Sequence, residues 1–178
     1  LQGQRDGIYF EFVTNSRILF NNSHNNLRYG LHFMFSHNNL YKGNTFSGNG
    51  AGVAVMYSHR VTMIGNTFTW NQGESSYGIL MKDISDSYVN GNFFSSNTIG
   101  IYMEGTSRIK VENNTFSSNG WAFRIQASCD DITVSRNKFI GNTFDVATNG
   151  NLVLNKFELN YWDKYEGYDR NKDGVGDV

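Results

Sequence analysis

The chain has 178 residues, with 15 Lys and Arg against 16 Asp and Glu, and this near balance excludes the clustered positive charge that nucleic-acid binding needs. Its length fits one domain, and 14 Phe and ten Tyr can supply a core, although Pro is entirely lacking. No apolar run is long enough to span a bilayer, and a single cysteine, Cys129, excludes an intrachain disulfide.

An asparagine followed two residues later by a phenylalanine recurs along the chain and defines a repeat. These asparagines stand at positions 44, 66, 92, 114, 137 and 155, in steps of 22, 26, 22, 23 and 18 residues. A glycine lies 14 residues before four of them, at positions 30, 52, 78 and 100, and Gly7 extends the series one coil earlier. Two markers with a common period predict a solenoid whose units stack on one another.

The residues after each glycine alternate, as in a β-strand with one buried face. In the second coil Leu31 and Phe33 are predicted to point inward, and His32 and Met34 outward. Coils of about 22 residues leave no room for a crossover helix, and stacked asparagines suit the turns between short strands. We therefore predict an all-β fold, a right-handed, single-stranded parallel β-helix, over residues 1–160.

Two departures from the period are informative. The 26-residue step adds four residues, 72–75, which are expected to form a surface loop. After residue 160 the composition changes, and residues 161–178 are predicted to form a C-terminal cap followed by an acidic tail. Solenoids need a cap over the last coil, and four aromatic residues are expected to provide it: Tyr161, Trp162, Tyr165 and Tyr168.

Two adjacent coils place potential metal ligands on their outer side. Met34 and Met56 lie one period apart, and His37 and His59 repeat the same spacing. Coils stack about 4.8 Å apart, so these residues and His32 should share one neighbourhood. Thioether and imidazole ligands together favour Cu(I). The alternative is that the methionines cover a neighbouring loop and the histidines are ordinary polar surface.

A second group could serve acid–base chemistry on sugars. Asp83 and Asp86 lie close together in the sequence, one coil from His59 and Arg60. Enzymes that cleave or epimerise polysaccharides need carboxylates, or a carboxylate with Arg and His, on one face. A solvated turn explains the same residues without any chemistry.

The C-terminal tail resembles the start of a calcium-binding loop. Asp169, Asn171, Asp173 and Asp177 place oxygen donors at the first, third, fifth and ninth positions around Gly174. The sequence ends before the position of the bidentate acid. Calcium is therefore a predicted ligand, and a polar terminus is the alternative.

Two coils and the tail resemble a known family. Segments 5–12 (RDGIYFEF) and 27–36 (LRYGLHFMFS) are similar to signature coils of NosD proteins, and NYWD at 160–163 with DGVGD at 173–177 resembles the end of that family. The general repeats between them are shared with many carbohydrate-binding and sugar-hydrolase-like β-helices. The resemblance thus covers nearly the whole chain.

The resemblance implies a periplasmic protein that is not an enzyme. NosD-like proteins dock on an ABC transporter, with NosF as its ATPase and NosY as its membrane subunit, and they interact with the copper chaperone NosL and with nitrous oxide reductase during maturation of its copper centres. His32 and Met34 lie within the matching motif, so a copper-handling role extends to them. Met56, His37 and His59 follow only from the stacking of coils.

Other interpretations stay open at this point. Without the His-Met motif the repeats are typical of β-helices that bind or process polysaccharides as lyases, hydrolases or epimerases. A structural adhesin or phage fibre domain would explain the coils but not the outward methionine pair. The sequence begins at Leu1 within the repeat and shows no signal peptide, so we expect a mature or truncated form.

Overall fold

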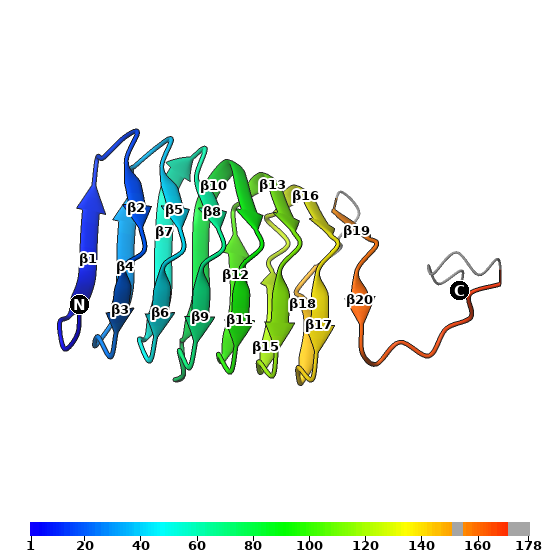
Figure 1. Cartoon of the computed structure of the whole chain (residues 1–178). Helices are drawn as coiled ribbons and strands as arrows, with labels where there is room; N and C mark the ends of the chain where they lie inside the picture. Colours follow the sequence, from blue (N-terminus) through cyan, green and yellow to red (C-terminus); the bar gives the residue numbers. More distant parts are fainter. Residues whose placement is uncertain (151–154, 171–178) are drawn as a thin grey trace.

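The computed structural model describes residues 1–150 and 155–170, which form a parallel β-solenoid (Figure 1). No helix occurs among these residues, and every strand pair is parallel. The parallel β-solenoid predicted from the sequence is thereby confirmed. One row of strands runs along its length in chain order: β1 (Asp6–Glu11), β4 (Tyr29–Met34), β7 (Ala51–His59), β10 (Tyr77–Asn90), β12 (Ile99–Glu104), β15 (Trp121–Ile125) and β18 (Phe144–Thr148).

Two further rows complete each coil. The second row belongs to the same 13-stranded sheet, because β10 is long enough to run through both rows: β2 (Arg17–Leu19), β5 (Leu40–Lys42), β8 (Thr62–Ile64), β13 (Ser107–Glu112), β16 (Asp130–Ser135) and β19 (Lys156–Glu158). The third row is a separate seven-stranded sheet: β3 (Asn22–His24), β6 (Thr45–Ser47), β9 (Thr67–Thr69), β11 (Phe93–Ser95), β14 (Thr115–Ser117), β17 (Lys138–Ile140) and β20 (Tyr161–Trp162).

A column of phenylalanine rings runs through the core. Phe68, Phe94 and Phe116 stack with centroids 4.8 Å apart at each step and have no exposed surface. Phe46 and Phe139 continue the column at its two ends. The phenylalanines of the first five Asn-x-Phe markers therefore form the core ladder that the repeat predicts, whereas Phe157 of the sixth lies in the second row beside Val134.

The marker asparagines form a ladder of hydrogen bonds beside this column. The Asn92 side chain donates from Nδ2 to Oδ1 of Asn114 at 3.0 Å and to the carbonyl of Met63 at 3.0 Å. Its own Oδ1 accepts from the backbone and side chain of Asn66. Buried amides satisfied in this way fix the register of successive coils. A second buried asparagine row was not anticipated from the sequence: Asn26, Asn49, Asn71, Asn97, Asn119 and Asn142.

The C-terminal end is covered by fewer aromatic residues than expected. Trp162 stacks on Phe139 with centroids 4.2 Å apart and so continues the ring column. Tyr161 precedes Trp162 in β20 and points to the other, exposed side of the strand. Tyr165 and Tyr168 are exposed as well, because the chain leaves the solenoid after β20 (Figure 1). The four inserted residues, 72–75, are exposed in a loop before β10, as the sequence indicated.

Candidate functional site

The outer side of β4 and β7 carries the thioether ligands. Parallel pairing sets Met34 directly beside Met56 and His32 beside Ala54. His32 and Met34 leave the same strand on the same face, about 6.6 Å apart along it. All three potential ligands are partly exposed. We refer to His32, Met34 and Met56 as the methionine face.

Ala54 reveals how closely the methionine face is packed. Its side chain points away from the core, in the same row as His32 and Leu80. It nevertheless has no exposed surface, so larger side chains on the neighbouring strands must close over it. The small residue at this position therefore lets the surrounding outward side chains pack closely over the strand.

His32 is held from several sides. Its ring packs against those of Tyr9 and Tyr29, with centroids 5.1 and 4.7 Å away. Its Nδ1 is buried, finds no hydrogen-bond partner, and lies 3.8 Å from Oδ2 of Asp6. Burial lowers the pKa of His32, and this effect outweighs the opposing influence of Asp6. A neutral imidazole is the form that binds metals.

His37 and His59 form a second pair at the next corner of the coil. Their rings stack with centroids 3.7 Å apart, and the backbone N–H of His59 donates to Nδ1 of His37 at 3.3 Å. Burial lowers the pKa of His37, and the nearby His59 and Arg60 lower it further. Because Nδ1 of His37 accepts this hydrogen bond, Nε2 carries the proton in the neutral ring, so His37 must change partners before it can bind a metal.

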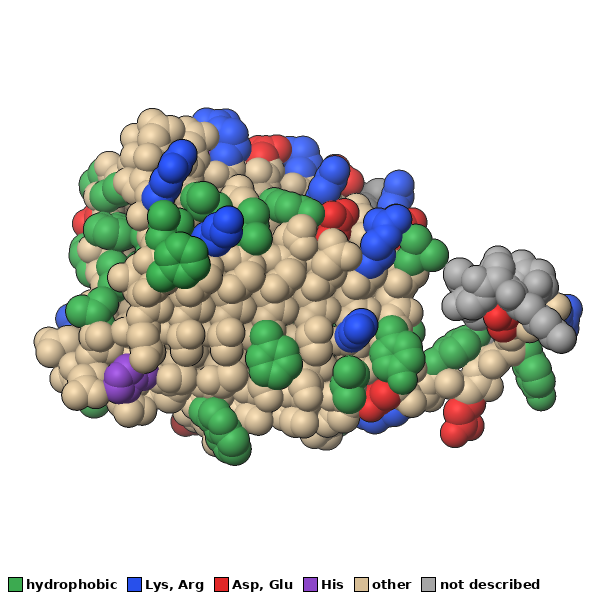
Figure 2. All heavy atoms as spheres, in the orientation of Figure 1, with side chains coloured by type: hydrophobic (Ala, Val, Ile, Leu, Met, Phe, Trp, Pro, Cys, Tyr) green, Lys and Arg blue, Asp and Glu red, His purple; other side chains and the backbone are tan. Residues whose placement is uncertain are grey.

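An aromatic row separates the two groups of potential ligands. Phe12, Phe35 and Tyr57 stack at 5.3 and 5.0 Å, each with a positive φ at a corner of its coil. Phe12 is 74% exposed, and the other two are also open to solvent. Figure 2 shows hydrophobic side chains gathered over the N-terminal coils, whereas Lys and Arg dominate the upper edge of the later coils. The spacing of 23 and 22 residues could have revealed this row, which the sequence interpretation missed.

The donor set decides what the methionine face can bind. Within residues 1–150 and 155–170, no three His, Cys, Asp or Glu side chains converge where they could hold a metal ion. A metal site here must therefore use the sulfur atoms of Met34 and Met56, and two thioethers with one imidazole select a soft, low-valent ion. Cys129 is buried in a turn, accepts a hydrogen bond from Thr106 at 3.3 Å, and takes no part.

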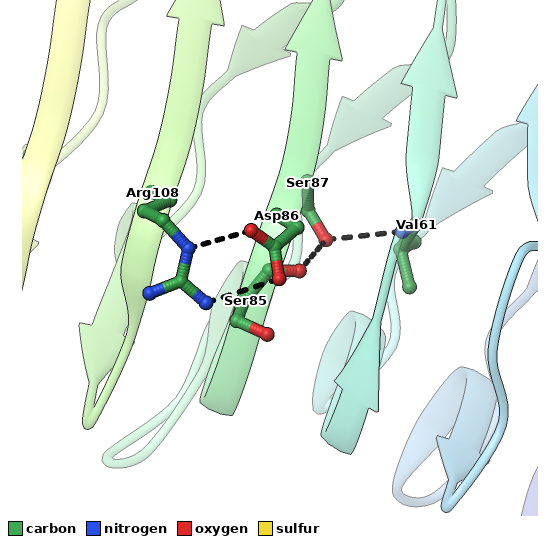
Figure 3. A network of polar contacts seen from close by, with 5 residues as sticks. All are labelled: Val61, Ser85, Asp86, Ser87 and Arg108. Carbon is green, nitrogen blue, oxygen red and sulfur yellow. Dashed lines mark hydrogen bonds and ion pairs between the residues drawn. The ribbon is translucent and has the colours of Figure 1, made fainter.

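The two carboxylates considered for acid–base chemistry, Asp83 and Asp86, lie at separate corners of their coil. Arg108 binds Asp86 through Nε at 2.6 Å and Nη2 at 3.0 Å (Figure 3). These hydrogen bonds lower the pKa of Asp86 to about 2, so this carboxyl stays ionised at neutral pH and cannot act as a general acid. Asp83 lies at the preceding corner, against Gly105. The surface depression beside this ion pair has a volume of about 490 Å³ and is lined by Asp86, Ser87, Tyr88, Arg108, Lys110 and Glu112.

The predicted calcium loop falls mainly outside the described residues. Asp169 is described and exposed, whereas Asn171, Asp173 and Asp177 lie beyond the described part of the chain. Calcium binding by the tail therefore stays a prediction.

A separate finding concerns membranes: among the described residues there is no helix long and apolar enough to cross one.

Comparisons with known proteins add a family and a fold. A family model described as "Periplasmic copper-binding protein (NosD)" matches residues 1–167. None of the curated proteins matches the chain. Among solved structures, a mutant of the periplasmic alginate epimerase AlgG is similar, with a TM-score of 0.71 and 12% sequence identity over 88% of this chain and 47% of the epimerase chain. At that identity the likeness shows the fold alone, and the chain spans about half the length of this structural relative.

Proposed function

The chain belongs to the NosD family of periplasmic copper-binding proteins, and we propose that it is a non-enzymatic periplasmic factor in the assembly of the copper centres of nitrous oxide reductase. Its methionine face accepts Cu(I) as cargo. The observation that carries this proposal is the register of β4 with β7, which sets two partly exposed methionines side by side, on the same strand face as a histidine.

The chemistry of the three ligands supports Cu(I) over harder ions. Thioether sulfur is a soft, neutral ligand, and imidazole binds copper in either oxidation state. Of the two ring nitrogens of His32, Nδ1 is buried, so Nε2 is the one that can reach an ion from the solvent side. His32, Met34 and Met56 would then supply one nitrogen and two sulfur ligands to a single ion.

Transfer requires that the ion also leaves. Paired strands fix the backbone of each ligand, while the unbranched methionine side chains can move without disturbing the core. His37 and His59, at the next corner, provide a second binding site for the copper ion once His37 releases its hydrogen bond with the backbone N–H of His59. Copper would thus be held loosely and exchanged, in keeping with a carrier.

The proposed partners are those that family membership implies. We propose that the chain receives copper from a NosL-type chaperone, docks on an ABC transporter of the NosF and NosY type, and serves nitrous oxide reductase. The exposed aromatic row beside the methionine face, formed by Phe12, Phe35 and Tyr57, offers apolar surface for such contacts.

Anaerobic titration with Cu(I) tests the proposal. The double variant Met34→Leu/Met56→Leu keeps the volume of both side chains but removes both sulfur ligands. The matched control is Met81→Leu/Met103→Leu, since these methionines are also register neighbours but lie fully buried in the core. Such volume-conserving changes cost less than about 1.5 kcal/mol. We expect the first variant to lose Cu(I) and the second to keep it.

The same pair of variants separates the two candidate functions in cells. If the Met34→Leu/Met56→Leu protein still supports a reductase with its full copper content, the copper role of this face is wrong. Binding to uronate polymers by both variants alike would then favour the alternative, a polysaccharide-binding or polysaccharide-processing β-helix.

A further inference from the structure

Two buried polar atoms near the methionine face have no hydrogen-bond partner. They are Oδ1 of Asp6 and Nδ1 of His32, and apart from one tyrosine hydroxyl they are the only such side-chain atoms among the described residues. A buried polar atom left unpaired costs about 1–3 kcal/mol, so native structures rarely keep one without a function. The side chains of Asp6 and His32 are 15% and 12% exposed, and they approach each other to 3.8 Å.

We infer that Asp6 is a positioning residue for His32. The Asp6 carboxylate accepts a hydrogen bond from Nδ1–H of His32, which leaves the lone pair of Nε2 free to bind a metal ion. The role of this contact in metal binding rests on the proposed copper function, whereas the contact itself does not depend on it. Asp6 comes from β1 and His32 from β4, so the contact joins the first two coils. A small shift of either side chain closes the 3.8 Å gap to a hydrogen bond.

The surroundings of His32 support this role. Tyr9 and Tyr29 contact the imidazole with ring planes inclined at 67° and 54°, which restricts its rotation. The Tyr9 hydroxyl donates to Glu11 and the Tyr29 hydroxyl accepts from Arg28, and neither forms a hydrogen bond with Nδ1 of His32. The carboxylate of Asp6, 3.8 Å away, is the charged group that approaches this nitrogen.

Asp6 acts through His32 and not as a ligand of the same ion. The two nitrogens of an imidazole point in diverging directions, so a carboxylate on the Nδ1 side cannot reach an ion held at Nε2. Histidine ligands commonly donate their second N–H to a carboxylate, which fixes the tautomer and the ring orientation. In this chain the arrangement would direct Nε2 towards the sulfur atoms of Met34 and Met56.

The test is the tautomer of His32 in the metal-free protein, read from nitrogen-15 NMR of the imidazole. Wild type is expected to carry the proton on Nδ1, and Asp6→Leu is expected to move it to Nε2. Asp6→Asn keeps a carbonyl acceptor and should restore the wild-type tautomer. The control Glu11→Gln removes a nearby carboxylate that contacts Tyr9, and it should change nothing at His32.

Copper affinity then distinguishes the two proposals. Asp6→Leu should weaken Cu(I) binding about 10- to 100-fold with unchanged stoichiometry, the usual effect of removing such a partner. If the tautomer shifts but the affinity does not, Asp6 positions His32 while the copper function of His32 is wrong. A wild-type His32 protonated on Nε2, or a tautomer unaffected by Asp6→Leu, overturns the inference whatever copper does.

Discussion

One outward row of the solenoid changes its chemistry twice, beginning with Glu11 in the first coil and becoming charged again after the third. In the second and third coils the row carries Met34 and Met56 side by side. In the next two coils it carries Lys82 and Glu104, which form an ion pair at 3.3 Å. The backbone geometry of the two regions is the same, so the fold leaves the choice of outward side chain free. A soft pair in place of an ion pair therefore points to function rather than to stability.

The adjacent corner changes in the same place. Phe12, Phe35 and Tyr57 form the stacked aromatic row of the early coils, and Asp83 and Gly105 occupy the equivalent corners of the later ones. Apolar surface and soft ligands thus end together after the third coil. The comparison teaches that the N-terminal coils are specialised on their outer side, while the core ladders continue unchanged beneath.

The largest effect should come from the shared core. Replacing Phe94 by Ala removes a fully buried ring from the middle of the column, and it should lower the free energy of unfolding by about 3–5 kcal/mol. The neighbouring Phe93 is 40% exposed, so Phe93→Ala serves as the control and should cost far less. Denaturant melts measure both changes. Equal losses would mean that the column does not carry the fold.

Enlarging the fully covered side chain at Ala54 should remove the copper binding that distinguishes the N-terminal coils. Ala54→Leu adds bulk between His32 and Leu80 and should lower Cu(I) affinity at least tenfold, or about 1.4 kcal/mol, by pushing the ligands apart. Ala147 lies in the same row, opposite Arg124 in a later coil. Ala147→Leu is the matched control and should leave copper binding intact. Competition with a chelator of known affinity gives the measurement, and equal weakening by both variants would count against a local site.

The smallest effect concerns Tyr41 in the N-terminal coils. Its hydroxyl is buried without a partner, and burial raises its pKa well above 10. Above pH 10 the unfolded chain releases this proton while the folded chain retains it, so stability should fall with rising pH by up to about 1.4 kcal/mol per unit. Tyr41→Phe should remove that slope and leave stability at pH 7 unchanged or slightly higher.

A control separates this residue from the other tyrosines. Tyr57 is 42% exposed, so Tyr57→Phe should retain the alkaline loss of stability. Melts between pH 8 and about 11 on wild type and both variants provide the comparison. An unchanged slope in Tyr41→Phe would show that another group causes the alkaline loss.

The sequence predicted the parts of this structure that depend on period. The Asn-x-Phe markers located the ring column and one asparagine ladder, and the 22-residue spacing placed Met34 beside Met56. The sequence pattern did not predict the features that depend on side-chain packing. Neither the approach of Asp6 to His32 nor the complete cover over Ala54 could be read from spacing, because both depend on where neighbouring side chains turn.

The cap and the second histidine pair illustrate the same limit. Four aromatic residues suggested a cap, and Trp162 is the one whose ring continues the phenylalanine column, stacked on Phe139. His37 and His59 were expected to share one neighbourhood with the methionines, and their stacked rings follow the corner at Phe35. A period fixes which residues stack, whereas the corner geometry fixes which stacks face one another.

X-ray absorption spectroscopy of the Cu(I)-loaded protein tests copper binding by the methionine face, because it counts the atoms bound to the metal. We expect two sulfur ligands and one nitrogen ligand for copper in the wild-type protein, with both sulfur ligands lost in Met34→Leu/Met56→Leu and retained in Met81→Leu/Met103→Leu. A wild-type spectrum with only nitrogen and oxygen ligands, or sulfur ligands that survive the Met34→Leu/Met56→Leu change, would contradict this expectation.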